Sequence, residues 1–169
     1  VQQLERLLEE KHENIAAVIV EPLLQGAGGM IVHPVEFLQR VRELCTRYDV
    51  LLIADEVLTG FGRTGKMFAC NVAGIVPDLM CLSKGITGGF LPMGATVCSD
   101  RVEGPFRSEN RLHTFYHGHS YTGNALACAA ANASLQIFAD EPVFERIAVI
   151  AEVKPERLEE VPEHAKVGD

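Results

Sequence analysis

The stretch VLLIADEVLTGFGRTG, residues 50–65, carries the strongest fold signal in this chain of 169 residues. It begins with five apolar residues, which is typical of a strand buried in a parallel sheet. Two acids, Asp55 and Glu56, follow the strand directly, and a glycine-rich loop comes after them. In open α/β sheets, ligands bind beyond the carboxyl ends of the strands. The stretch therefore predicts a buried strand with a functional edge behind it.

The glycines of TGFGRTG, residues 59–65, also fit the dinucleotide-binding pattern G-x-G-x-x-G. In that motif the glycines join a strand directly to a long helix, whose N-terminus receives the pyrophosphate. Here Asp55 and the four residues after it separate the strand from Gly60, and Gly74 and Pro77 interrupt any helix beyond the loop. The sequence therefore favours a tight loop that needs glycine conformations over a nicotinamide or flavin site.

Hydrophobic periodicity predicts an α/β fold around this strand. Further buried strands are expected at residues 16–22, 78–83 and 94–99, and helices at residues 2–11, 34–48 and 124–139. Residues 24–33 are expected to form a loop, and residues 141–160 to be mostly helical with a break at Pro155. Helices between nearly continuous apolar strands imply a mainly parallel sheet with helices on both faces.

Composition narrows the class of protein. Hydrophobic residues make up 47% and charged residues 22%, which is typical of a globular domain with one core. The net charge of -8 disfavours a nucleic-acid partner, and no apolar run is long enough to predict a membrane helix. The five cysteines lack C-x-x-C spacing, so reduced thiols and a cytoplasmic location are expected.

A histidine cluster raises the alternative of a metal site. His113, His117 and His119 lie within seven residues, but no acid or cysteine beside them completes a ligand set. We therefore expect no metal, and a role for His117 and His119 in shaping a cofactor pocket or a subunit contact.

Two charged residues at the ends of predicted strands indicate a specific chemistry. Lys84 ends the strand at 78–83 and is followed by a glycine-rich turn, where partial desolvation would lower its pKa and make its amine a nucleophile for carbonyls. Asp55 ends an apolar strand, where a carboxylate is costly unless it has a cationic partner. Pyridoxal 5'-phosphate requires both groups: a lysine for the Schiff base and a carboxylate for the pyridinium nitrogen. Taken singly, each residue is better explained without chemistry: Lys84 by a solvated surface charge, and Asp55 by a helix cap or a salt bridge.

Four ordered motifs resemble the class III aminotransferases, which have the fold type I of pyridoxal-phosphate enzymes. The motifs are VIVEP, LLIADEVLTGFGRTGKMFAC, PDLMCLSKGITGG and HGHSYTGNALACAAANASL, and the resemblance covers residues 15–140. It implies that Lys84 binds the cofactor covalently, that Asp55 pairs with its pyridine nitrogen and that Val57 packs against its ring. Ser120 stands where the family usually has Thr, and this implies a homodimer in which its hydroxyl contacts the cofactor phosphate of the neighbouring subunit.

Two departures from the family pattern reduce the number of substrate classes that the sequence favours. Relatives that act on ornithine, acetylornithine or 4-aminobutyrate commonly have Gln where this chain has Leu58, and Glu where it has Ala27. The resemblance is greater to the branch that aminates 8-amino-7-oxononanoate in biotin biosynthesis, with S-adenosylmethionine or lysine as the amino donor. In that branch an arginine at the position of Arg63 lies near the substrate, although a loop arginine that binds local carbonyls explains Arg63 equally well.

The resemblance also predicts the domain organisation. Residues 1–140 are expected to be part of the pyridoxal-phosphate-binding large domain, and residues 141–169 a helical segment leading toward a C-terminal small domain. The family's phosphate-binding loop normally lies before residue 1 and its substrate-carboxylate arginine after residue 169, so the isolated chain is expected to be inactive. The alternatives are a class III aminotransferase for an omega-amino acid or amine, and a non-catalytic dimerising protein.

Overall fold

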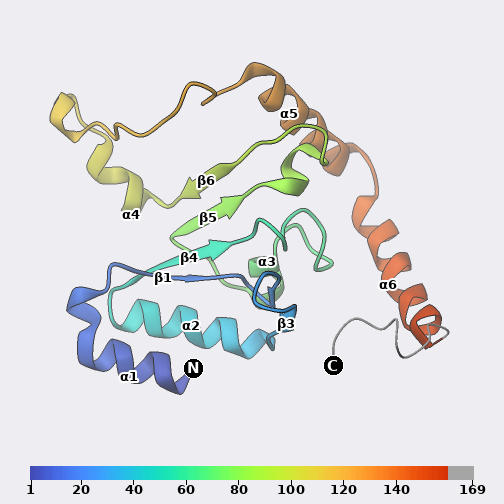
Figure 1. Ribbon diagram of the computed structural model, residues 1–169, viewed down its shortest axis with the longest axis horizontal. Helices are drawn as coiled ribbons and strands as arrows, with labels where there is room; N and C mark the ends of the chain where they lie inside the picture. Colours follow the sequence, from blue (N-terminus) through green and yellow to red (C-terminus); the bar gives the residue numbers. More distant parts are fainter. Residues whose placement is uncertain (160–169) are drawn as a thin grey trace.

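A four-stranded sheet forms the centre of the computed structural model, which describes residues 1–159, with side chains described through residue 152 (Figure 1). Its strands are β1 (Ala17–Val20), β4 (Leu51–Asp55), β5 (Leu79–Leu82) and β6 (Ala95–Cys98), in the order β1-β4-β5-β6. β1 and β5 pair with β4 in parallel, and β6 pairs with β5 in antiparallel orientation. The four predicted strands and the mainly parallel sheet are thus confirmed.

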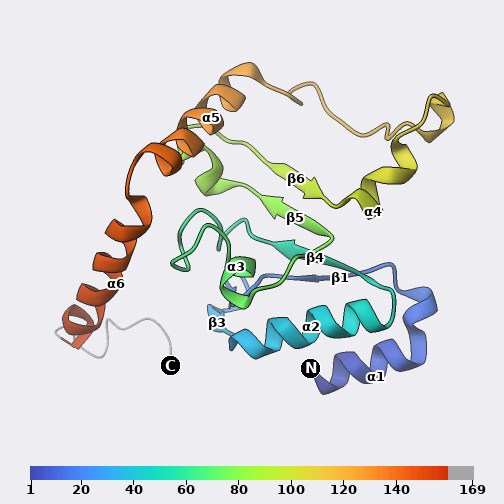
Figure 2. The ribbon, with the colours of Figure 1, turned by 180° about the vertical axis from the view of Figure 1, so that it is seen from behind.

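The helices follow the predicted order along the chain. They are α1 (Gln2–Lys11), α2 (Val35–Arg47), α3 (Ala69–Ala73), α4 (Asp100–Glu103), α5 (Ala125–Asp140) and α6 (Val143–Glu159). Figure 2 shows α1 and α2 side by side below β1, while α4 follows the end of β6 and α5 and α6 lie at the opposite side of the molecule from α4. None of the helices in residues 1–159 is long and apolar enough to cross a membrane.

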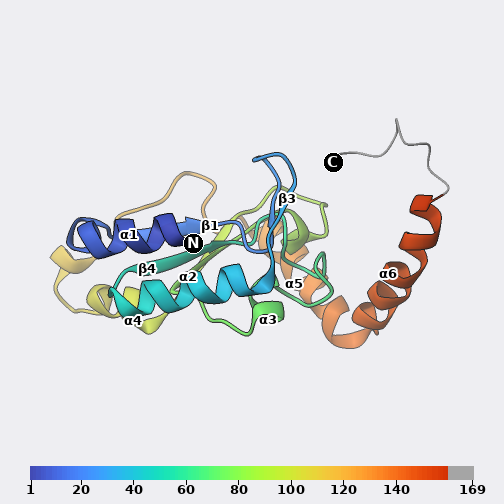
Figure 3. The ribbon, with the colours of Figure 1, turned by 90° about the horizontal axis from the view of Figure 1, so that it is seen from below.

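One face of the sheet is packed against helices because its side chains alternate. Val20 of β1 and Leu52 of β4 point to the same side and share a core with Leu38 and Val41 of α2 and Ala73 of α3. Residues at the intervening positions point to the other side, where Ile19 is 63% exposed. Figure 3 shows α2 and α3 together on one side of the sheet. The predicted second helical layer is not seen over Ile19 within the described residues.

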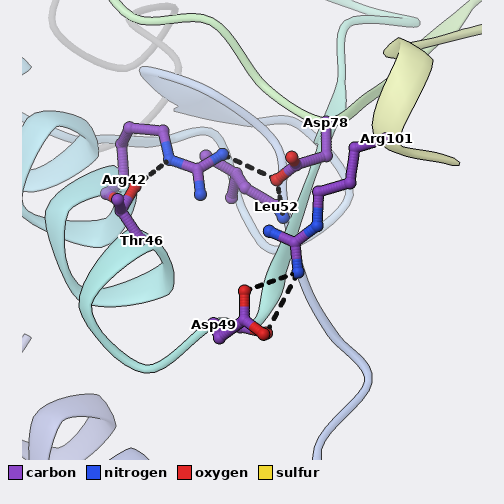
Figure 4. A network of polar contacts seen from close by, with 6 residues as sticks. All are labelled: Arg42, Thr46, Asp49, Leu52, Asp78 and Arg101. Atoms are coloured by element: carbon purple, nitrogen blue, oxygen red, sulfur yellow. Dashed lines mark hydrogen bonds and ion pairs between the residues drawn. The ribbon is translucent and has the colours of Figure 1, made fainter.

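A half-buried network joins the amino ends of β4 and β5 (Figure 4). Asp78 precedes β5, and its Oδ2 accepts hydrogen bonds from the Leu52 N–H at 2.8 Å and from Arg42 Nη1 of α2 at 2.7 Å. The N–H of Asp78 in turn donates to the carbonyl of Leu52 at 2.9 Å. Burial raises the pKa of Asp78, but these hydrogen bonds and the arginine charges outweigh burial, so its pKa lies below the ordinary value. The carboxylate therefore joins two strands and a helix.

Two local expectations are wrong. Residues 24–33 do not form a plain loop, because β2 (Leu24–Gln25) and β3 (Ile31–Val32) pair as a short antiparallel hairpin. The helix α6 also continues through Pro155 to Glu159. A proline removes only one N–H donor from a helix, and this loss does not end α6.

Candidate functional site

The predicted site residues lie at the carboxyl ends of neighbouring strands. Asp55 is the last residue of β4 and pairs in register with Cys81 of β5. Lys84 comes two residues after the end of β5 and begins the short 3-10 helix η2 (Lys84–Thr87). Because β4 and β5 are parallel neighbours, Asp55 and the Lys84 turn meet at the same edge of the sheet. The register thus confirms the shared edge, while the chemical roles of both residues stay predictions.

Asp55 is half-buried, and its Oδ1 accepts a hydrogen bond from the N–H of Val57 at 3.1 Å. Among the residues with described side chains, Oδ2 has no hydrogen-bond donor. Burial raises the pKa of the nearby Cys81 thiol, and the negative charge of Asp55 raises it further. Asp55 therefore presents one free carboxylate oxygen on the face of the sheet opposite α2.

Glu56, the next residue, makes buried contacts that the sequence alone does not predict. Its carboxylate is 0% exposed and points to the helix side. Oε2 accepts hydrogen bonds from the Thr59 hydroxyl at 2.6 Å and the Ala69 N–H at 3.0 Å, and Oε1 accepts one from the Cys70 N–H at 2.7 Å. The strand alternation could have placed Glu56 opposite Asp55, but its donors lie up to 14 residues away in the sequence.

The glycine-rich loop packs directly on the Lys84 turn. Phe61, at φ 57°, contacts Gly85 so closely that a Cβ atom added to this glycine would lie 2.8 Å from the Phe61 Cβ. Lys84 itself has a φ of 46°, a left-handed conformation that costs free energy in any residue with a Cβ. The backbone of Lys84 is therefore held in a strained turn with its exposed side chain beside the loop.

A pocket of about 270 Å³ brings three predicted site residues together. Val57, Arg63 and Lys84 line it, together with Ile147 of α6. The Nε of Arg63 donates to the carbonyl of Leu58 at 2.7 Å, so this arginine makes the local carbonyl contact that was the alternative to a substrate role. Arg63 and Lys84 thus line the same pocket.

Ser120 is not part of this pocket. It is exposed in the segment between α4 and α5, in which every side chain from 107 to 126 is exposed. Its neighbours His119 and Tyr121 line a separate pocket of about 670 Å³ together with Ser83. Among the described residues, no three histidine, cysteine, aspartate or glutamate side chains are grouped as metal ligands require.

Comparisons with known proteins identify the family. The aminotransferase class-III family matches residues 1–169. The adenosylmethionine-8-amino-7-oxononanoate aminotransferase of Geobacter sulfurreducens is 49% identical over 168 residues, which make up 99% of this chain and 37% of that protein. The chain thus spans little more than a third of the length of this relative.

Solved structures agree with this assignment. A Bacillus anthracis aminotransferase superposes with a TM-score of 0.88 at 37% identity, covering 99% of this chain and 38% of that one. An amine transaminase from an uncultivated Pseudomonas species, solved in its PLP-bound form, gives a TM-score of 0.73 at 46% identity, covering 80% of this chain and 31% of that one. The chain therefore belongs to the class III aminotransferases.

Proposed function

We propose that the full-length protein aminates 8-amino-7-oxononanoate to 7,8-diaminononanoate in biotin biosynthesis, with S-adenosylmethionine or lysine as the amino donor. The observation that carries the proposal is the meeting of Asp55 and the Lys84 turn at the edge of β4 and β5. The substrate is inferred from the 49% identical Geobacter sulfurreducens relative, whose name gives this acceptor and a methionine-derived donor.

Family membership indicates pyridoxal 5'-phosphate as the cofactor, and the residues present fit it. Lys84 offers an exposed amine at the pocket, and Asp55 keeps one carboxylate oxygen without a donor among the described side chains. Val57 lines the same pocket and offers an apolar surface for a flat ring. The family role carried over to each of these residues is therefore compatible with its position.

Each residue then has a definite task. The bound cofactor supplies an electron sink for the carbon that carries the amino group. Lys84 Nζ would hold the cofactor covalently, and its freed amine would take the proton from the donor's Cα and deliver it to the cofactor, with the reverse transfer serving the acceptor. Asp55 keeps a proton on the pyridine nitrogen, because a carboxylate beside a cation favours its charged form. Arg63 lines the same pocket, where the guanidinium nitrogens other than the Nε bound to the Leu58 carbonyl would contact the substrate.

We also propose that the protein is a homodimer and that Ser120 completes the partner's site. Ser120 lies outside the pocket of Lys84 and in a fully exposed segment. Large apolar side chains of this segment are also exposed, among them Leu112 at 88% and Tyr116 at 80%. An exposed group of this kind is typical of a surface that a partner covers.

Borohydride reduction tests the chemistry. The full-length protein is incubated with pyridoxal 5'-phosphate, reduced and mapped by peptide mass spectrometry. We expect a phosphopyridoxyl adduct confined to Lys84, whereas no adduct, or adducts spread over exposed lysines such as Lys11 and Lys66, would favour a non-catalytic protein.

The solved relative titled an amine transaminase, at 46% identity, favours one second candidate: an aminotransferase for omega-amino acids or amines. Assays with 8-amino-7-oxononanoate and with simple omega-amines separate the two. Turnover of the amines alone would overturn the biotin-pathway assignment and leave the cofactor chemistry intact.

A further inference from the structure

The buried carboxylate of Glu56 is the charged group at this site that the proposed mechanism does not use. It binds the Thr59 hydroxyl at the start of the glycine-rich loop and the N–H groups of Ala69 and Cys70 at its end. These three donors satisfy a carboxylate that would otherwise be costly to bury. One side chain thus holds both ends of the loop of residues 59–68.

The same side chain also fixes the backbone around it. The carbonyl of Glu56 accepts a hydrogen bond from the Gly60 N–H at 2.9 Å, and its own N–H donates to the Cys81 carbonyl of β5 at 3.0 Å. Asp55 and Val57 flank Glu56 on either side, so the bonds that hold Glu56 also restrain their backbone. Glu56 therefore sets the position of the free Asp55 carboxylate oxygen relative to β5.

The glycine-rich loop held by Glu56 contacts the turn that contains Lys84. Phe61 lies near the start of the loop, packs edge-on against Phe68 with ring centroids 5.7 Å apart and meets Gly85 with no room for a further Cβ atom. The N–H of Phe61 donates to the carbonyl of Met67 at 2.6 Å, which closes the loop beneath the ring. A loop released from Glu56 would move Phe61, and with it the strained turn of Lys84.

We propose that Glu56 is the positioning residue that sets the geometry between Asp55 and Lys84. The inference rests on the proposed function, since it concerns the distance between the two groups that bind one cofactor. A buried carboxylate that only stabilised the fold would affect the free energy of unfolding and leave the cofactor site unchanged.

The test compares Glu56→Gln with Asp78→Asn in the full-length protein. Asp78 is a matched control because its carboxylate also accepts a backbone N–H and a side-chain donor, but at the amino end of β5. Three quantities are measured for each variant: the melting temperature without cofactor, the dissociation constant for pyridoxal 5'-phosphate, and the pH midpoint of the absorbance of the bound cofactor.

We expect both variants to melt at a lower temperature, because each loses hydrogen bonds to a buried charge. Only Glu56→Gln should weaken cofactor binding, by about tenfold, the size of one hydrogen bond to a charged group, and only it should move the pH midpoint. The proposal would be overturned if both variants lost the same amount of melting temperature while Glu56→Gln kept the wild-type cofactor affinity and the wild-type pH midpoint. A wild-type protein that binds no cofactor at Lys84 would instead overturn the proposed function.

Thr59→Val keeps the test decisive if Glu56→Gln does not fold. This change removes the 2.6 Å hydroxyl donor and preserves the shape of the side chain and both backbone donors. We expect a smaller loss of cofactor affinity in the same direction together with a shifted midpoint. A variant that folds and binds the cofactor as the wild type does would count against the positioning role.

Discussion

At the scale of single residues, Asp55 and Glu56 show how two adjacent carboxylates acquire different tasks. The strand alternation sends Asp55 to the open side of the sheet and Glu56 to the helix side. Glu56 is surrounded by three donors, while Asp55 accepts one backbone N–H through Oδ1. The environment, and not the chemical type, therefore decides which acid is available to a ligand.

Replacement of Asp55 by Asn tests the role of the free oxygen. An amide cannot hold a proton on the pyridine nitrogen, so we expect kcat/KM for transamination to fall by roughly a hundredfold or more, the effect of removing one preorganised charge. Borohydride labelling of Lys84 should persist, because covalent attachment does not require the carboxylate.

The control for this change is Asp49→Asn, which removes the exposed ion pair with Arg101 at the other end of β4. It should leave kcat/KM at the wild-type value, since exposed ion pairs contribute little. An Asp55→Asn variant as active as the wild type would refute the assignment of Asp55.

At the scale of elements, the sequence predicted strands and long helices better than the connections between them. The apolar runs around Leu52 and the periodic face of α2 predict their elements because burial selects them directly. The β2-β3 hairpin was missed because Ile31 and Val32 are exposed and their pairing rests on backbone hydrogen bonds that leave no composition signal. The contacts of Glu56 leave no signal in the sequence for the same reason, since two of its donors are backbone N–H groups.

The junction of β4, β5 and α2 should make the stability depend on pH through Asp78. The pKa of Asp78 in the folded protein lies below its ordinary value of 3.8. Ionised Asp78 therefore stabilises the fold above pH 3.8, and this contribution is lost as the pH falls from 3.8 through the folded pKa. We expect Asp78→Asn to lower the free energy of unfolding by about 1–3 kcal/mol at neutral pH.

Urea titrations at neutral pH and at the lowest pH at which the wild type stays folded check this prediction. The difference between wild type and Asp78→Asn should shrink at the acidic end. A difference that stays constant with pH would show that the charge of Asp78 makes no contribution.

The docking of α6 on the glycine-rich loop can be tested with two glycines. Gly62 and Gly65 both have a φ of 91°, so a Cβ atom strains each backbone alike. A Cβ on Gly62 would lie 2.5 Å from Ile147 Cδ1 of α6, whereas a Cβ on Gly65 would meet nothing within 4 Å. We expect Gly62→Ala to destabilise the protein by about 1 kcal/mol more than Gly65→Ala, because it overpacks this contact.

Thermal unfolding of the two variants measures this difference directly. Equal melting temperatures would mean that α6 is not held against the loop by Ile147.

At the scale of the whole molecule, the described residues contain the pocket beside Lys84 and an exposed segment that does not line it. Val57, Arg63 and Lys84 line the pocket, while Ser120 lies in an exposed segment outside it. The sequence motifs identified these residues, but they could not show which of them meet within one subunit. If the dimer forms as proposed, the missing neighbour of Lys84 is supplied by a second copy.

Mixed dimers test this arrangement. A dimer of one Lys84→Ala subunit and one Ser120→Ala subunit regains one intact site if Ser120 acts on the neighbouring subunit, and none if it acts within its own. We expect Ser120→Ala homodimers to bind pyridoxal 5'-phosphate weakly, and the mixed dimer to bind one equivalent with wild-type affinity. Titration of differently tagged, purified mixed dimers gives the measurement. Weak binding at every site of the mixed dimer would place Ser120 in its own subunit's site, and wild-type affinity in Ser120→Ala homodimers would remove Ser120 from both sites.

The contact between Asp78 and Leu52 has a consequence for how the chain avoids misassembly. Asp78 accepts the N–H of Leu52 through its carboxylate and donates its own N–H to the carbonyl of Leu52, so it recognises one residue of β4 from both sides. A slip of β4 by a single residue would turn each of its side chains to the opposite face. Asp55 and Glu56 would then exchange places, and the wrong acid would face the ligand. The contact between Asp78 and Leu52 disfavours that slip. A contact at the amino end of β4 therefore determines which of the two neighbouring acids at its carboxyl end faces the ligand.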